Sequence, residues 1–189
     1  MRNLVAIVCF FLSGTAGLVY EVAWIREASL VFGSTTFAIS SVLAVFFLGL
    51  ACGSYLFGRI GTRVSQPLKH YAKLEIPLGL YAVASLFIFD IAHYIYGAWY
   101  RDLGDHTGLL FVARFALVTI IILPPTILMG GTLPLFCRQY VISRDSIARS
   151  VGFLYGVNTL GAAAGCALAG FLLLPVLGLT RTVWVGASL

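Results

Sequence analysis

Long apolar runs, separated by short polar connections, constrain this chain more than any other feature. The runs begin near Leu4, Thr35, Leu74, Leu109 and Val151. A helix needs about 20 apolar residues to cross the ~30 Å hydrocarbon core of a bilayer, and these runs reach that length. Because 60% of the residues are hydrophobic and 10% are charged, the chain has too little polar surface for a water-soluble globule. We therefore expect an integral membrane protein.

The runs are uniformly apolar, whereas the strands of a membrane barrel alternate apolar and polar residues. Helices are then the way to satisfy every backbone group in lipid. The sequence predicts an all-α membrane protein with five to six transmembrane helices in a single domain over 1–189. The expected helices cover about 4–22, 35–58, 74–96, 109–141, 151–174 and 182–189, the last being cut short.

The first run could also be a secretory signal peptide, because a short apolar core followed by small residues is typical of one. The run continues past its small residues to Val22, which favours a retained helix with Trp24 at the membrane interface.

The cysteines lie singly in apolar segments, and no two of them form a C-x-x-C pair. They are Cys9, Cys52, Cys137 and Cys166. Such residues behave as small buried hydrophobes. We expect no disulfide framework, no metal site and no cofactor.

Two eleven-residue segments, 48–58 and 160–170, resemble each other without a gap. Six of their positions are identical, among them three pairs of glycines: Gly49 and Gly161, Gly53 and Gly165, Gly58 and Gly170. The Gly-x-x-x-Gly spacing puts small residues on one helix face, where another backbone can approach closely. We expect these glycines to lie at helix contacts. Coincidence is the alternative, because Leu, Ala and Gly are abundant in membrane segments.

The charges of the loops favour one orientation. A cytoplasmic N-terminus puts eight basic residues on the cytoplasmic side, Arg2, Arg59, Arg63, Lys69, Lys73, Arg138, Arg144 and Arg149, against Arg26, Arg101 and Arg181 on the other. Cytoplasmic loops are enriched in Lys and Arg. The basic face suits anionic lipid heads, and nothing in the sequence calls for nucleic acid.

With this orientation, the segments 35–58 and 151–174 cross the membrane in opposite directions. The similar glycine segments then occupy equivalent places in two three-helix units of opposite orientation. A 3+3 inverted repeat of this kind forms half of a major-facilitator transporter.

The run from 109 to 141 is too long for one straight crossing. Pro124, Pro125, Gly130, Gly131 and Pro134 lie inside it, so we expect a kink. One interpretation is a bend that neighbouring helices accommodate. The other is a discontinuous helix whose free backbone groups line a site.

Ionisable residues within the spans are the candidate functional residues. An unpaired charge at the centre of a span costs about 2.5–3.5 kcal/mol on insertion scales, so we expect Asp90, with His93 three residues later, to pair with Arg114. This pair could be a structural clasp. Alternatively, Asp90 and Glu21 could form a cation or proton site. Glu75 is expected to lie near enough to the boundary to be solvated.

Several segments, in order along nearly the whole chain, resemble the membrane domain of fused major-facilitator/spermidine-synthase-like proteins. They are Leu12–Gly14 (LSG), Tyr20–Arg26 (YEVAWIR), Phe32–Thr36 (FGSTT), Val42–Ala44 (VLA), Gly49–Ser54 (GLACGS), Gly58–Arg59, Leu123–Pro134 (LPPTILMGGTLP) and Leu154–Gly161 (LYGVNTLG). The resemblance implies a location in the inner membrane of a bacterium and a soluble synthase-like domain elsewhere. The 189-residue sequence contains no adenosyl-cofactor fingerprint and no acidic cluster for a polyamine. We therefore expect no catalysis by this chain.

Three classes of function remain. The chain could be a non-catalytic anchor or scaffold with a polyamine-related role. It could be a transporter-like domain for a small cation or polyamine, which would act as a dimer because one half-bundle has no partner to move against. It could also be an accessory subunit that packs against other membrane subunits.

Overall fold

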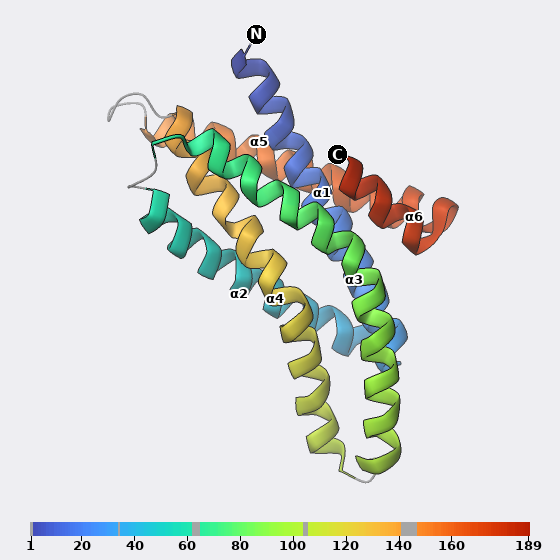
Figure 1. Cartoon of the computed structure of the whole chain (residues 1–189). Coiled ribbons are helices and arrows are strands. Elements are labelled where there is room, and N and C mark those ends of the chain that lie inside the picture. Colours follow the sequence, from blue (N-terminus) through green and yellow to red (C-terminus); the bar gives the residue numbers. More distant parts are fainter. Residues whose placement is uncertain (1, 34, 62–64, 104–105, 141–146) are drawn as a thin grey trace.

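The computed structural model describes residues 2–33, 35–61, 65–103, 106–140 and 147–189 (Figure 1). Its elements are α1 (Arg2–Phe32), α2 (Thr35–Gly61), α3 (Pro67–Leu103), α4 (Thr107–Tyr140), α5 (Ile147–Leu168), the π-helical turn η2 (Ala169–Leu173) and α6 (Leu174–Ser188). Five helical stretches are long and apolar enough to cross a membrane, with 148–188 counted as one. The predicted all-helical fold with membrane-length helices is confirmed for the described residues.

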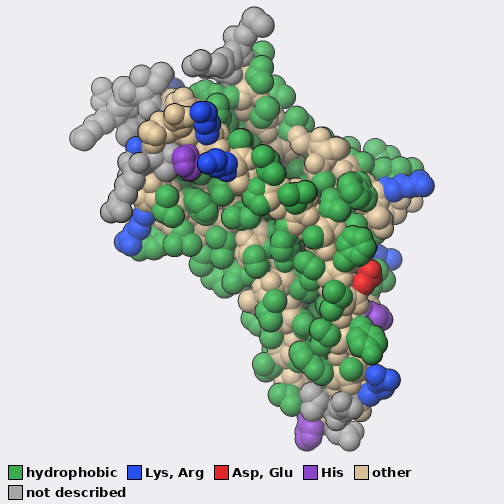
Figure 2. Space-filling model, viewed as in Figure 1, with side chains coloured by type: hydrophobic (Ala, Val, Ile, Leu, Met, Phe, Trp, Pro, Cys, Tyr) green, Lys and Arg blue, Asp and Glu red, His purple; other side chains and the backbone are tan. Residues whose placement is uncertain are grey.

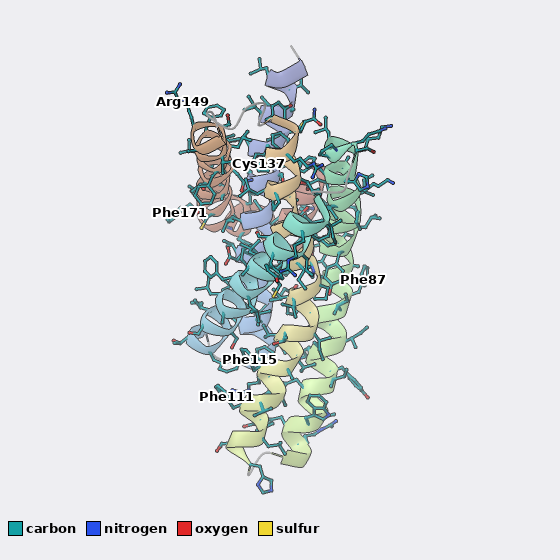
Figure 3. The ribbon with its side chains drawn as sticks, turned by 90° about the vertical axis from the view of Figure 1, so that its left-hand side faces the viewer. Phe87, Phe111, Phe115, Cys137, Arg149 and Phe171 are labelled. Atoms are coloured by element: carbon teal, nitrogen blue, oxygen red, sulfur yellow. The ribbon has the colours of Figure 1, made fainter. Side chains whose placement is uncertain are left out.

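The outer surface of the bundle is apolar. Figure 2 shows hydrophobic side chains over most of the visible face. Large side chains such as Phe87, Phe111 and Phe171 are exposed and project outward from the helices (Figure 3). Large apolar patches are rare on soluble monomers, so a surface of this kind is consistent with a multi-pass membrane protein.

Gly178 turns the chain near its C-terminal end. It has a φ of 74° inside α6, a conformation that is costly for residues with a side chain. The chain reverses there, so the last part of α6 lies against α1 and α3 (Figure 1). The helix expected at 182–189 is this returning segment.

Two helix pairs form the main contacts of the bundle. α2 packs along α4, and α5 packs along α1. In Figure 1, α2 ends at the side of the molecule where α5 begins, so these two helices run in opposite directions.

Glycines hold α2 close to α4. A Cβ on Gly49 would collide with the side chain of Thr126, and a Cβ on Gly53 would collide with the carbonyl of Ile127 and meet the backbone of Gly130. Such positions let two helix backbones touch, which strengthens packing in lipid.

The equivalent glycines of the second segment lie against α1. A Cβ on Gly161 would collide with the carbonyl oxygen of Phe11, and one on Gly165 with that of Thr15. The last pair of the repeat is different, because a Cβ on Gly58 or Gly170 would meet nothing within 4 Å. Four of the six repeat glycines therefore lie at close helix contacts.

Two of the three prolines of α4 leave carbonyl groups that neighbouring helices satisfy. Pro125 and Pro134 lack the N–H that would bond the carbonyl four residues earlier. Those carbonyls belong to Ile121 and Gly130, and each accepts a hydroxyl: that of Tyr81 at 2.7 Å and that of Ser54 at 2.9 Å, respectively. α4 is helical throughout Thr107–Tyr140 and curves in Figure 1. The helix is thus bent and supported by its neighbours, rather than broken.

Replacing Tyr81 by phenylalanine is expected to lower the free energy of unfolding by about 1–2 kcal/mol, because the carbonyl of Ile121 loses its partner while the ring remains. Unfolding in mixed detergent micelles, followed by circular dichroism, measures the change. Tyr94→Phe is the matched control, since Tyr94 lies exposed on the same helix and its loss should change stability by less than about 0.5 kcal/mol. Equal effects of the two variants would contradict the assignment.

Candidate functional site

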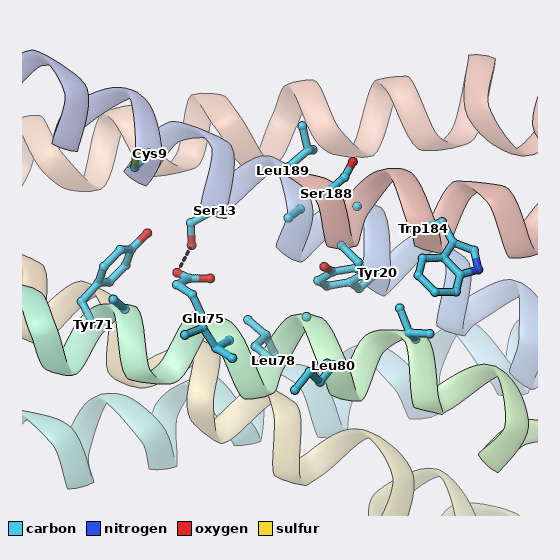
Figure 4. Close-up of a pocket in the computed structure, with 17 residues that line it drawn as sticks. Cys9, Ser13, Tyr20, Tyr71, Glu75, Leu78, Leu80, Trp184, Ser188 and Leu189 are labelled. Carbon is cyan, nitrogen blue, oxygen red and sulfur yellow. Dashed lines mark hydrogen bonds between the residues drawn. The ribbon is translucent and has the colours of Figure 1, made fainter.

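A cavity of about 650 Å³ lies between α1, α3 and α6 (Figure 4). Its lining includes Cys9, Ser13, Ala16 and Tyr20 from α1, residues between Tyr71 and Val83 from α3, residues between Trp184 and Ser188 from α6, and Leu189 directly after α6. Small-molecule sites usually occupy about 300–1,000 Å³, so this cavity is large enough for a small organic ligand.

One end of the cavity is polar. Glu75 is the one charged side chain among the described lining residues. The hydroxyl of Ser13 donates a hydrogen bond of 2.6 Å to its Oε1. The hydroxyl of Tyr71 points toward the same pair (Figure 4). This end therefore combines a carboxylate with two hydroxyl groups.

An aromatic cluster fixes the position of Tyr71. Its ring packs edge-on against Phe10 and Phe136, with centroids 6.2 and 5.3 Å away. Phe10 and Phe136 stack on each other at 4.3 Å. Because three helices contribute to this cluster, the Tyr71 side chain is held in place beside Glu75.

The other end of the cavity is aromatic. The Tyr20 side chain is 2% exposed and points its hydroxyl along the cavity toward Glu75 (Figure 4). Trp184 lies beyond it on α6. Gly186 allows α6 to approach, since a Cβ there would press on the Tyr20 ring at 2.7 Å.

Helical spacing explains why these residues face one another. Ser13 and Tyr20 are seven residues apart on α1, and Tyr71 and Glu75 are four apart on α3. Residues at these spacings share one helix face. Gly14 lies next to Ser13 but contacts Asn158 of α5, so one face of α1 serves the cavity and another serves helix packing.

Glu21 lies outside this cavity. It is 4% exposed, and its Oε1 has no hydrogen-bond partner among the residues that the structure describes. A buried acidic group destabilises the fold unless its oxygens are hydrogen-bonded or paired with an opposite charge.

Replacing Glu21 by methionine is expected to raise the free energy of unfolding by about 1–3 kcal/mol, because the side chain keeps its length while a buried oxygen without a partner is removed. Denaturation in mixed micelles measures the change. Glu21→Gln is the control that retains a polar group, and it should give little gain. A loss of stability in Glu21→Met would show that the carboxyl group is needed for folding.

Among the residues that the structure describes, no ion pair joins the four candidate charged residues, Glu21, Asp90, His93 and Arg114. Asp90 and His93 are exposed on α3. The Arg114 Nε donates a hydrogen bond of 2.7 Å to the hydroxyl of Tyr96. Its guanidinium lies over the rings of Tyr96 and Phe37, at 5.1 and 5.8 Å. Among the described residues, Arg114 is therefore held by aromatic groups, and the pairing with Asp90 expected from the sequence is absent there.

Glu75, expected from the sequence to lie near the membrane boundary, is half-buried and accepts a hydrogen bond from Ser13 of α1. One sequence signal marks it: the positions three and four residues away on either side are Tyr71, Ala72, Leu78 and Gly79, and none of them is basic. An acidic residue in an apolar helix without a basic neighbour on its own face needs a partner from elsewhere.

Comparison with known proteins shows distant similarity to two curated proteins. No protein-family model and no solved structure match the chain. Polyamine aminopropyltransferases 2 and 1 of Ralstonia nicotianae (strain ATCC BAA-1114 / GMI1000) are each 24% identical over 180 residues, or 95% of this chain, but over only 32% and 31% of their own lengths. The chain spans about a third of the curated relatives that it matches. It is thus distantly similar to a part of polyamine aminopropyltransferases, as the resemblance of its motifs implied.

Proposed function

We propose that this chain is a non-catalytic, multi-pass membrane domain that holds spermidine-synthase-like chemistry at the membrane, either as part of a longer protein or by binding a separate enzyme. One observation carries the proposal. The similarity covers 95% of this chain and about a third of proteins named for aminopropyl transfer, and the matching part is made of membrane-length helices.

The charge at one end of the bundle supports an inner-membrane location with a cytoplasmic N-terminus. Exposed basic residues lie at the end of α2, the start of α3, the end of α4 and the start of α5: Arg59, Lys69, Lys73, Arg138 and Arg149. Basic side chains gather on this part of the surface in Figure 2. Anionic lipid would attract such a face. Arg63 and Arg144, expected on the same side, lie outside the described residues.

The helix pairing supports a 3+3 inverted repeat as in half of a major-facilitator protein. In such a repeat, the first unit is α1 to α3 and the second is α4 to α6, so α1 corresponds to α4 and α2 corresponds to α5. The contact of α2 with α4 then becomes that of α5 with α1, and these are the main pairs of the bundle. The equivalent glycines Gly53 and Gly165 lie at the two contacts.

Expression of the chain in a bacterium tests the anchoring function. We expect the chain to stay in membranes after an alkaline wash and, after affinity capture in mild detergent, to retain aminopropyltransferase activity from a fused or bound enzyme. A captured chain without this activity, or a chain released by the wash, would overturn the proposal. Capture of an unrelated multi-pass protein of similar size is the control.

A transporter-like domain for a small cation or polyamine is the second candidate. The cavity with its single carboxylate supports it, because such a site could bind a cation within the bundle. Two copies would associate to complete the transporter. Uptake of a labelled polyamine by proteoliposomes tests this function, with protein-free liposomes as the control.

A further inference from the structure

We infer that the cavity between α1, α3 and α6 binds an aliphatic amine in its protonated form, with the ammonium group at Glu75 and the hydrocarbon part directed toward Tyr20 and Trp184. The inference concerns binding alone and depends on neither the anchoring nor the transport function.

The charge of the residues that line the cavity favours binding of a cation. Glu75 accepts a hydrogen bond from Ser13 and has the Tyr71 hydroxyl beside it, whereas a carboxylate can accept about four hydrogen bonds. None of the described lining residues is Lys, Arg or His. A carboxylate in such surroundings is costly unless an opposite charge is supplied. A cation that enters from outside the chain would supply that charge.

The donors and acceptors fit an ammonium group better than a metal ion. Calcium takes six to eight oxygen ligands, and magnesium requires an octahedral set. The polar end offers the carboxylate of Glu75 and the hydroxyls of Ser13 and Tyr71. The described residues also contain no group of three His, Cys, Asp or Glu side chains that could hold a metal ion. An ammonium has three N–H donors, which the carboxylate and the two hydroxyls can accept.

The rest of the cavity fits a hydrocarbon chain. Between its two ends, α3 contributes apolar side chains that include Leu78, Leu80 and Val83. Methylene groups gain free energy against such a wall because they leave water. At the far end, the faces of Tyr20 and Trp184 could also attract a second ammonium group. The volume of about 650 Å³ far exceeds that of a single hydrated ion.

Isothermal titration of the purified chain in lipid nanodiscs tests the inference, with 1,4-diaminobutane and hexylamine as probes at neutral pH. We expect saturable binding of both amines and at least a tenfold weakening in Glu75→Gln, which keeps the shape of the side chain and removes its charge. Glu27→Gln is the matched control, because Glu27 does not line the cavity. It should bind as the unmodified chain does.

Three outcomes would overturn the inference: no saturable binding, equal binding by Glu75→Gln and the unmodified chain, or displacement of the amines by equimolar sodium or potassium. A second measurement applies if Glu75→Gln fails to fold. An apolar carbodiimide labels carboxyl groups of the unmodified chain, and mass spectrometry reports each site. The amines should lower labelling at Glu75 at least fivefold and leave Glu27 unchanged. Equal labelling of Glu75 with and without amine would also overturn the inference.

Discussion

Replacing Gly53 by leucine is expected to lower the free energy of unfolding by about 3 kcal/mol or more, the upper end of the effects of overpacking. Even the Cβ would collide with the carbonyl of Ile127 on α4, and the backbone of Gly130 lies beside it. Backbone atoms cannot move aside as a flexible side chain can, so α2 and α4 would have to separate along their contact. Unfolding in mixed micelles, followed by circular dichroism, measures the loss.

The repeat provides a matched test of the same effect. Gly165→Leu should have a similar cost, because a Cβ there would collide with the carbonyl of Thr15 on α1. Gly58→Leu and Gly170→Leu are the controls, since nothing lies within 4 Å of a Cβ at either position. These two should keep or raise stability, because leucine is favoured over glycine within a helix by about 0.5–1 kcal/mol. Equal costs at all four positions would contradict the role of the helix contacts, because leucine favours a helix more than glycine does and cannot lower stability through propensity.

Replacing Trp24 by alanine is expected to lower the free energy of unfolding by about 3–5 kcal/mol. The side chain is 1% exposed, and its Nε1 donates a hydrogen bond of 2.9 Å to the Ser85 Oγ of α3. Alanine would leave a cavity between α1 and α3 and remove this bond. The same unfolding measurement reports the loss.

Two further variants separate packing from hydrogen bonding at this position. Trp24→Phe should cost less than Trp24→Ala, because it retains a ring. Ser85→Ala should cost about 1–2 kcal/mol, because it removes the acceptor for Trp24 and also the hydroxyl that donates to the carbonyl of Ala82. Trp99→Ala is the control for losing a tryptophan, since Trp99 is exposed near the end of α3. A cost at Trp99 equal to that at Trp24 would contradict the packing argument.

The burial of Trp24 against another helix could not be predicted from the sequence. The sequence places it just beyond an apolar run, which favours a membrane interface. In the structure, α1 continues to Phe32, and Trp24 is buried against α3. Composition along one segment cannot reveal that a second helix covers it.

The segments that carry the family resemblance meet in pairs. Gly14 in the first segment lies against Asn158 in the last, and the Asn158 Nδ2 donates to the carbonyl of Phe10 at 3.1 Å. Ser54 of the second helix similarly bonds the carbonyl of Gly130. The glycine spacing predicted that helices would approach closely. It gave no information about which helix would approach which.

The sequence by itself determined the membrane-length apolar helices, because hydropathy and span length depend on neighbours along the chain. It also marked the small-residue faces, because helical spacing is local. Tertiary structure alone decided the partner of each face, the hydroxyls that reach the carbonyls of Ile121 and Gly130, and the meeting of Glu75 with Ser13. These contacts join residues far apart in the chain and depend on how each helix is rotated and crossed against the others, which no local pattern specifies.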